Sequence, residues 1–322
     1  MLLNYIGIIT GLALLVYGAD KFVQGAANTA RVMGLSPLII GMTIVGFATS
    51  APEMLVGSVA AIDGKTEIAI GNALGSNIAN IGLVLGIAII LKPIVVMSRT
   101  LKREYIIMSI AILITFLLSL DMSLTRADAG LLLLCMAGSF YALIHIAKKS
   151  HVSDQLNLEF EQELARDSKP GLSILILLFG LILLLAGAEI LVRSSVNIAR
   201  FYGLSDLVIG LTIIAVGTSL PELAATLAGL VKKEPGIAVG NVIGSNMFNM
   251  LVVISVPVLI QPTQIAAIVI WRDFTVMIAF TLIMGWMIYF NRSETRERIV
   301  GCLLFTGFLA YQIWLLTQAS GN

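Results

Sequence analysis

Gly-Phe-Ala-Thr-Ser-Ala-Pro-Glu, residues 46–53, and Ala-Val-Gly-Thr-Ser-Leu-Pro-Glu, residues 215–222, are two versions of one pattern. Each lies inside an apolar run that is long enough to cross a bilayer, so each places a carboxylate, a threonine and a serine where water is scarce. A proline stands one residue before each carboxylate and is expected to interrupt the helix there. The two glutamates, Glu53 and Glu222, are 169 residues apart.

The same offset of 169 residues extends well beyond these eight positions. The pattern Gly-Asn-x-x-Gly-Ser-Asn-x-x-Asn occurs at 71–80 and again at 240–249. When 34–80 is aligned with 203–249, 20 of 47 positions are identical and no gap is needed. A match of this extent indicates a duplicated unit.

The composition predicts an integral membrane protein. Of the 322 residues, 58% are hydrophobic and 12% are charged, and the mean hydropathy is +0.98. A soluble domain carries about 25% charged residues. The net charge of +1 gives no support for nucleic-acid binding. Cys135 and Cys302 lie in separate apolar runs, which favours packing over a disulfide or a metal site.

Ten apolar runs are long enough to be candidate membrane spans. They are 3–25, 36–61, 67–91, 104–120, 127–147, 171–193, 205–231, 236–260, 268–290 and 299–317. The 169-residue shift places the first five on the last five. We therefore predict an all-α membrane protein with ten transmembrane helices: a five-helix repeat at 1–147, a polar cytoplasmic linker at 148–170 and a second five-helix repeat at 171–322.

An odd number of spans in each repeat makes the two repeats enter the membrane from opposite sides, so their topologies are inverted. Of the 20 Lys and Arg residues, 15 fall in the loops on one side and 5 in the loops on the other. The positive-inside rule assigns the richer side to the cytoplasm. Both termini are then expected to face the exterior or periplasm.

The two glutamates are the strongest candidates for a functional site, because ionisable residues within spans are costly and are kept for function. Few other carboxylates lie deep in the predicted spans, and solvation at the interface is expected to explain Glu104, Asp128 and Asp273. Each proline also removes a backbone donor and frees carbonyls in the preceding turn. Carbonyls of this kind are tolerated within a bilayer only where they are satisfied, for example by cations in a cavity.

Other oxygen donors share helix faces with these carboxylates, because residues four apart lie on one side of a helix. The pairs are Thr49 with Glu53, Thr218 with Glu222, Ser76 with Asn80, and Ser245 with Asn249. Calcium takes six to eight oxygen ligands in irregular geometry. A transition metal would favour His or Cys, and the two motifs contain neither.

A structural explanation of the motifs is a helix kink with hydrogen bonds between helices, in which the glycines of the second motif allow close packing. The repetition of both motifs at one spacing favours a cation site instead.

The paired motifs resemble the two alpha repeats of the cation/calcium antiporter superfamily. The resemblance covers essentially the whole chain and is greatest for the YrbG-type calcium/sodium antiporters of bacterial inner membranes, which are related to the sodium/calcium exchangers. It implies a multi-pass inner-membrane protein in which the second, third, seventh and eighth helices form a central ion site. It also implies alternating access by sliding of the first and sixth helices across that core.

The resemblance further implies which residues bind the transported ions. The implied ligands are Glu53, Glu222, Thr49, Thr218, Ser50, Ser219, Ser76, Ser245, Asn80 and Asn249, with backbone carbonyls at Gly46 and Ala215. Asn249 departs from the archaeal relative and from potassium-dependent exchangers, which have Asp at this position. This departure argues against potassium co-transport and leaves the site with two formal negative charges.

We expect a Ca²⁺/Na⁺ antiporter whose substrates are the two ions, with membrane lipid around it and no cofactor, catalytic residue or obligate protein partner. A proton-coupled divalent cation antiporter and a cation channel with the same ligands are the alternatives. An intramembrane hydrolase lacks support, since the chain has neither His-Glu-x-x-His nor Gly-x-Ser-x-Gly.

Overall fold

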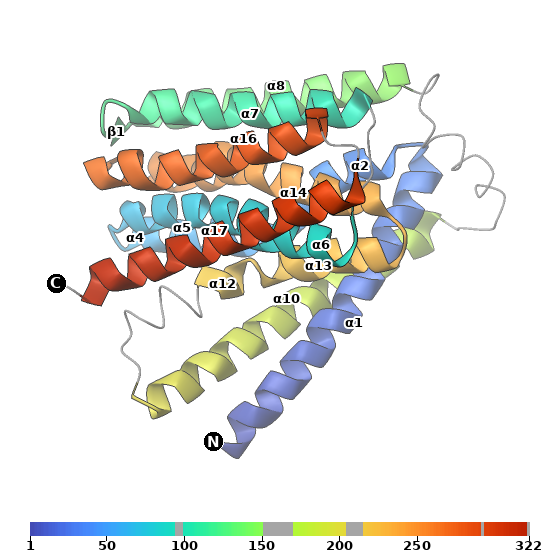
Figure 1. The fold of residues 1–322 in the computed structure, drawn as a ribbon, viewed down its shortest axis with the longest axis horizontal. Coiled ribbons are helices and arrows are strands. Elements are labelled where there is room, and N and C mark those ends of the chain that lie inside the picture. The colour runs from blue at the N-terminus through green and yellow to red at the C-terminus, as the bar shows by residue number, and fades with distance from the viewer. Residues whose placement is uncertain (94–98, 151–169, 204–214, 291–292, 321–322) are drawn as a thin grey trace.

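Long helices, many of them broken within a membrane-spanning run, make up the chain (Figure 1). The computed structural model describes residues 1–93, 99–150, 170–203, 215–290 and 293–320. The first half contains α1 (Leu2–Met33), α2 (Pro37–Ile40), η1 (Gly41–Val45), α3 (Gly46–Thr49), α4 (Ala51–Ile62), α5 (Thr66–Ala79), η2 (Asn80–Leu85), α6 (Gly86–Leu91), α7 (Arg99–Ser119), β1 (Ser123–Leu124) and α8 (Arg126–Ser150), where η marks a π-helical segment.

The second half repeats the pattern of interrupted helices. It contains α10 (Pro170–Phe201), α12 (Ala215–Thr218), α13 (Leu220–Val231), α14 (Pro235–Phe248), η4 (Asn249–Val253), α15 (Ser255–Ile260), β2 (Thr263–Gln264), η5 (Val269–Phe274), α16 (Thr275–Phe290) and α17 (Glu294–Ser320). The two short strands pair antiparallel, with Ser123 opposite Gln264 and Leu124 opposite Thr263.

Eight helical runs are long and apolar enough to cross a membrane, so the chain is an all-helical protein of the membrane type. Two of the ten predicted spans are not among them. The span predicted at 104–120 falls in α7, and the span predicted at 205–231 falls partly on 204–214, outside the described residues, and continues into the shorter apolar helix α13. Most of the predicted linker at 148–170 also lies outside the described residues.

The helix break predicted at the proline is confirmed in both motifs, at the serine two residues before it. Ser50 has φ −83° and ψ 1°, and Ser219 has φ −87° and ψ 4°. Pro52 and Pro221 then stand in the first turn of α4 and of α13, where the missing N–H has no helical partner to lose. The break therefore separates each Thr-Ser pair from the glutamate that follows it.

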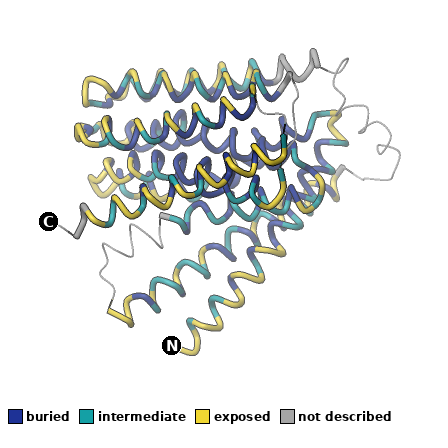
Figure 2. The backbone as a smooth tube through the Cα atoms, in the orientation of Figure 1, coloured by how far each residue is buried: buried dark blue, intermediate teal, exposed yellow. Residues whose placement is uncertain are grey.

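The centre of the molecule is formed by the run from α5 to η2 and the run from α14 to η4, which are buried along most of their length (Figure 2). Backbone contact sets the position of α14. A Cβ atom on Gly244 would lie 2.2 Å from the Met42 carbonyl oxygen, and one on Gly240 would lie 2.4 Å from the Leu38 carbonyl oxygen. Glycine at these positions lets α14 pack closely against α2 and η1.

The helices α1 and α10 form a second close-packed unit, which runs diagonally past the other helices (Figure 1). A Cβ atom on Gly18 would lie 2.3 Å from the Leu184 backbone nitrogen, and one on Gly187 would lie 2.4 Å from the Leu15 backbone nitrogen. The buried apolar residues of this pair belong to a cluster separate from the main core. The pair is therefore built as a two-helix unit resting against the central helices.

The prediction that solvation explains the carboxylates of α7 and η5 is wrong. Glu104 is 0% exposed and Asp273 is 6% exposed. Asp273 accepts hydrogen bonds from Arg272 Nε at 2.7 Å and from Tyr311 Oη at 2.8 Å, so protein groups replace water around it. Asp128, in contrast, is half-buried and accepts a hydrogen bond from the Thr125 backbone N–H at 2.8 Å.

Candidate cation site

Two buried carboxylates lie at the breaks in the two motif helices. Glu53 is in the first turn of α4 and Glu222 is in the first turn of α13, and both are 0% exposed. The N-terminus of a helix favours a negative charge in this position, because its N–H groups lack partners. Ser50, three residues before Glu53, donates a hydrogen bond to Glu222 Oε1 at 3.4 Å, so the two helix breaks lie next to each other. The structure thus brings together the two glutamates that the duplicated motif singled out.

Each carboxylate accepts a hydrogen bond from a serine through one of its oxygens. Ser50 Oγ donates to Glu222 Oε1 at 3.4 Å, so a first-repeat hydroxyl reaches the second-repeat carboxylate. Ser76 Oγ donates to Glu53 Oε1 at 3.4 Å. The other oxygen of each carboxylate, Oε2, is buried without a hydrogen-bond partner among the described residues. One oxygen on each side is therefore available to a cation.

The hydroxyls of Thr49 and Ser245 meet where α3 crosses α14. Thr49 Oγ1 lies 3.3 Å from Ser245 Oγ and donates to the Val45 carbonyl oxygen at 3.1 Å. The Gly46 carbonyl, predicted to be freed by the proline, accepts from the Ser50 N–H at 3.2 Å and from Ser245 Oγ at 3.4 Å. The Gly46 carbonyl oxygen therefore lies among the predicted ligands, but it already accepts hydrogen bonds from protein donors.

Asn80 and Asn249 are buried at equivalent positions, and each is the first residue of a π-helical segment, η2 or η4. Within the part of the chain that the structure describes, neither side-chain amide has a hydrogen-bond partner on its nitrogen or its oxygen. Leaving such a group unsatisfied costs about 1–3 kcal/mol. A π-helical turn is often found at functional sites, and these two aim unsatisfied amides into the interior.

The remaining predicted ligands of the second repeat are placed unevenly. Ser219 is buried, and its hydroxyl has no hydrogen-bond partner in the described ranges. Thr218 is half-buried at the end of α12 and engages another group. Ala215 is the first residue of α12, and the surroundings of its side chain lie outside the described residues. The first-repeat half of the site is therefore described more fully than the second.

Asn241, the second residue of the Gly-Asn-x-x-Gly-Ser-Asn-x-x-Asn motif, supports the site. The sequence prediction missed this role. Asn241 Nδ2 donates to the Glu222 carbonyl oxygen at 3.1 Å and to Thr226 Oγ1 at 3.0 Å, and Asn241 Oδ1 accepts from Thr49 Oγ1 at 3.1 Å. Asn72, its equivalent, donates to the carbonyl oxygen of the first-repeat glutamate at 3.5 Å. The shared 169-residue offset was the available signal, since both asparagines occur in the duplicated motif.

The set of donors suits a hard cation. Among the described residues no group of three or more His, Cys, Asp or Glu side chains could hold a metal ion. The donors are instead two carboxylates surrounded by hydroxyl, amide and carbonyl oxygens. Oxygen ligands of this kind match Ca²⁺ and other hard ions, whereas a soft or transition metal would need imidazole or thiolate.

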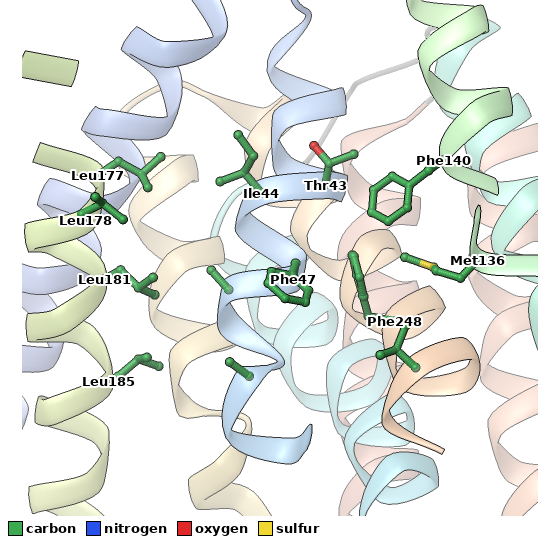
Figure 3. Close-up of a pocket in the computed structure, with 13 residues that line it drawn as sticks. Thr43, Ile44, Phe47, Met136, Phe140, Leu177, Leu178, Leu181, Leu185 and Phe248 are labelled. Atoms are coloured by element: carbon green, nitrogen blue, oxygen red, sulfur yellow. The ribbon is translucent and has the colours of Figure 1, made fainter. Parts of the chain in front are cut away.

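A separate apolar cavity of about 690 Å³ lies beside the site helices, between them and α8 and α10 (Figure 3). The only polar side chain on its wall is Thr43, and its hydroxyl donates to the Ile39 carbonyl oxygen at 2.7 Å. The wall includes Leu177, Leu178, Leu181 and Leu185 of α10, Met136 and Phe140 of α8, and Phe47 and Phe248. With no ionised group on its wall, this cavity is not where a cation would bind.

Comparison with known proteins agrees with this geometry. A family model described as sodium/calcium exchanger protein matches residues 3–145 and 172–317. The chain is 44% identical to CaxA of Alkalimonas amylolytica, a candidate antiporter by its name, over 99% of this chain and 100% of that protein. It is 38% identical to the inner membrane protein YrbG of Escherichia coli, over 98% of this chain and 96% of that protein.

Two further matches come from exchangers. The sodium/calcium exchanger MaX1 of Methanosarcina acetivorans is 30% identical over 97% of this chain and 98% of its own length. A solved structure of the sodium-calcium exchanger NCX_Mj superposes with a TM-score of 0.83 at 30% identity, and covers 96% of this chain and 97% of that one. The chain therefore belongs to the sodium/calcium exchanger family and is a membrane-embedded cation antiporter.

Proposed function

We propose that the protein exchanges Ca²⁺ for Na⁺ across the membrane through a single site at Glu53 and Glu222. One Ca²⁺ neutralises the two carboxylates, and several Na⁺ ions do the same when the site is reloaded from the other side. Occupancy by one ion type excludes the other, because both use the same oxygens. Calcium efflux driven by sodium entry is the direction that ordinary ion gradients favour.

The observation that supports this proposal is the pair of buried carboxylates with one unpartnered oxygen each, within the described part of the chain. Removing a charge from water costs several kcal/mol unless it is paired. Two uncompensated carboxylates would therefore make the ion-free site costly to move across the membrane. That cost is what makes exchange obligatory, because the site crosses readily only when cations neutralise it.

The ligand set of the proposal extends over both repeats. It comprises Thr49, Ser50, Ser76 and Asn80 from the first repeat, Thr218, Ser219, Ser245 and Asn249 from the second, and the carbonyls of Gly46 and Ala215. We further propose ten transmembrane helices in two inverted repeats, with both termini on the exterior or periplasmic side of the inner membrane. Alternating access then comes from sliding of the α1–α10 unit across the central helices.

The direct test is calcium-45 uptake into sodium-loaded proteoliposomes. Glu53→Gln and Glu222→Gln each remove one charge while keeping the side-chain shape, and each is expected to lower sodium-dependent uptake by at least about 100-fold. Glu67→Gln is the matched control, because Glu67 is exposed in the first turn of α5 and away from the site. Uptake that survives both site substitutions would remove the proposed site.

The same vesicles separate the two rival mechanisms. If a pH gradient in sodium-free medium drove calcium exchange as fast as a sodium gradient does, the coupling ion would be the proton. If calcium crossed without any counter-ion on the other side, the site would belong to a channel. Obligatory sodium dependence is the outcome that the proposal expects.

A further inference from the structure

Two ion pairs join α1 to the turn between α13 and α14. Arg31, in the last turn of α1, pairs with Glu234. Lys232 Nζ lies 2.6 Å from Asp20 Oδ1. The Arg31 and Glu234 side chains are 24% and 10% exposed, so this pair is less screened than an ordinary surface pair. Since α1 belongs to the α1–α10 unit and the turn belongs to the central helices, the pairs bridge the two parts that the proposed transport cycle moves.

The duplicated sequence does not preserve this charge pattern. Positions 169 residues apart are equivalent, and the relevant equivalents are Asp20 with Glu189, Arg31 with Arg200, Asp63 with Lys232, and Lys65 with Glu234. The charges on α1 and α10 keep their sign between repeats. The charges on the two turns, 63–65 and 232–234, are reversed.

We propose that these charges form a one-sided latch, defined as the pairs Arg31–Glu234 and Asp20–Lys232. The latch stabilises the conformation described here, in which α1 is held against the α13–α14 turn. In the opposite conformation the equivalent contacts would bring Glu189 toward Asp63 and Arg200 toward Lys65. Both would be repulsive, so the two conformations of the cycle differ in energy although the repeats share one fold. This inference rests on the proposed alternating access.

The opposite face of the structure shows the arrangement expected of an unlatched end. Glu189 pairs with Arg193 of its own helix, four residues away. Asp63 and Lys65 are both exposed in the turn between α4 and α5. In Figure 1 the C-terminal end of α10 and the N-terminal end of α1 diverge from the rest of the bundle. Among the described residues, the ion pairs that join the α1–α10 unit to the α13–α14 turn therefore lie near one end of the unit.

The latch predicts that the charges, and not the packing alone, set the balance between the two conformations. The full-length protein in lipid nanodiscs, with Cys135→Ser and Cys302→Ser, would carry spin labels at Met33→Cys and Val231→Cys. Both labelled positions are exposed, one at the end of α1 and the other at the end of α13. Without added ions, one short distance is expected to dominate.

Arg31→Gln combined with Lys232→Gln is expected to raise the long-distance population about tenfold, since two ion pairs are lost. Exchanging the charges with Arg31→Glu and Glu234→Arg is expected to keep the short distance dominant, because the pair forms again with its charges reversed. Asp63→Lys with Lys65→Glu would build complementary pairs on the other face, and is expected to favour the long distance even with the native latch present. Arg193→Gln is the matched control and is expected to change nothing, because Arg193 pairs within α10.

The outcomes distinguish the latch from the transport proposal. Unchanged distance distributions in both the Arg31/Lys232 and the Asp63/Lys65 variants would overturn the latch, and calcium-45 exchange measured on the same proteins would still report on transport. A wild-type protein that exchanges no cations would contradict the proposed function instead. Thermal unfolding of each variant identifies any that fail to fold. If the Arg31/Lys232 variant fails to fold, the Asp63/Lys65 variant still tests the latch.

Discussion

Glu53 and Glu222 each use one oxygen to accept a hydrogen bond from a serine and keep the other oxygen without a partner in the described residues. The arrangement leaves the two charges uncompensated by protein cations, and none of the ion pairs seen among the described residues involves either glutamate. An Arg or Lys partner would neutralise the site permanently. Its absence from the described surroundings is what allows mobile cations to do so instead.

The serine hydroxyls that touch the carboxylates are expected to tune affinity without being essential. Ser76→Ala removes the 3.4 Å contact to Glu53 Oε1. A hydrogen bond to a charged group contributes about 1.5–3 kcal/mol, so the Ca²⁺ concentration for half-maximal exchange should rise about tenfold or more. Ser58→Ala is the control, because Ser58 Oγ donates to a backbone carbonyl of its own helix. An unchanged calcium dependence in Ser76→Ala would show that this hydroxyl is not part of the site.

A single substitution can add one negative charge to the site. Asn249→Asp adds a third carboxylate at a buried position whose amide has no partner in the described structure. We expect tighter Ca²⁺ binding and a higher sodium concentration for half-maximal release, because more positive charge is then needed to neutralise the site. Isothermal titration of purified protein with Ca²⁺, in the presence and absence of Na⁺, measures both. Weaker Ca²⁺ binding in this variant would contradict a role for Asn249 as a ligand.

The duplicated pattern selected most of the residues that the structure places around the candidate site, and their role as ion ligands stays a prediction. A single Thr-Ser-x-Pro-Glu is explained by a kink, but two copies at one offset pointed to Glu53, Glu222 and the hydroxyls around them. The duplicated motif marked Asn241, but its contacts to Thr49 and Thr226 could not be derived, because they depend on how separate helices pack together. The burial of Asp273 was missed for the same reason, as Tyr311 lies on another helix.

At the scale of single elements, the π-helical segments η2 and η4 carry information that sequence did not. Both begin at the asparagine that closes a duplicated motif, Asn80 or Asn249. Hydrophobic periodicity does not distinguish a π turn from an α turn in a fully apolar run. The helix breaks at Ser50 and Ser219 were predictable, because a proline acts locally on the turn that precedes it.

Close packing of α1 on α10 gives a prediction for an element. Gly187→Val would push a side chain against the Leu15 backbone nitrogen, which lies 2.4 Å from the added Cβ. Overpacking of this kind costs about 1–3 kcal/mol, so thermal unfolding in detergent should shift to lower temperature. Gly138→Val in α8 is the control, since nothing lies within 4 Å of its added Cβ. Equal unfolding temperatures for the two variants would contradict the tight α1–α10 contact.

At the scale of the whole molecule, the helices broken at Ser50 and Ser219 meet at one candidate site, and the α1–α10 unit packs beside them. Sequence predicted the repeat and the membrane class from apolar runs, and eight of the ten predicted spans meet the length and composition of a membrane helix. The other two predicted spans, 104–120 and 205–231, are not among the eight. The run in α7 begins with charged residues, and the run before α13 is only partly described. The ten-helix inverted arrangement remains a prediction.

Coupling is a property of the whole molecule, because it depends on both conformations of the α1–α10 unit. With equal calcium outside, vesicles loaded with sodium should take up calcium-45 at least about tenfold faster than vesicles loaded with choline at the same pH. The reason is that the protein changes conformation slowly when the site is empty and its two buried charges are not neutralised. Equal rates in the two loadings would show that the site returns empty, which would rule out obligatory exchange.

The central claim is that Glu53 and Glu222 together hold the transported calcium ion. Anomalous scattering from crystals grown with Ca²⁺ tests it most directly, because it locates the ion without reference to activity. We predict one strong anomalous peak within about 2.3–2.6 Å of an oxygen of each carboxylate. A peak bound elsewhere in the helical bundle, with none between these two side chains, would contradict the account.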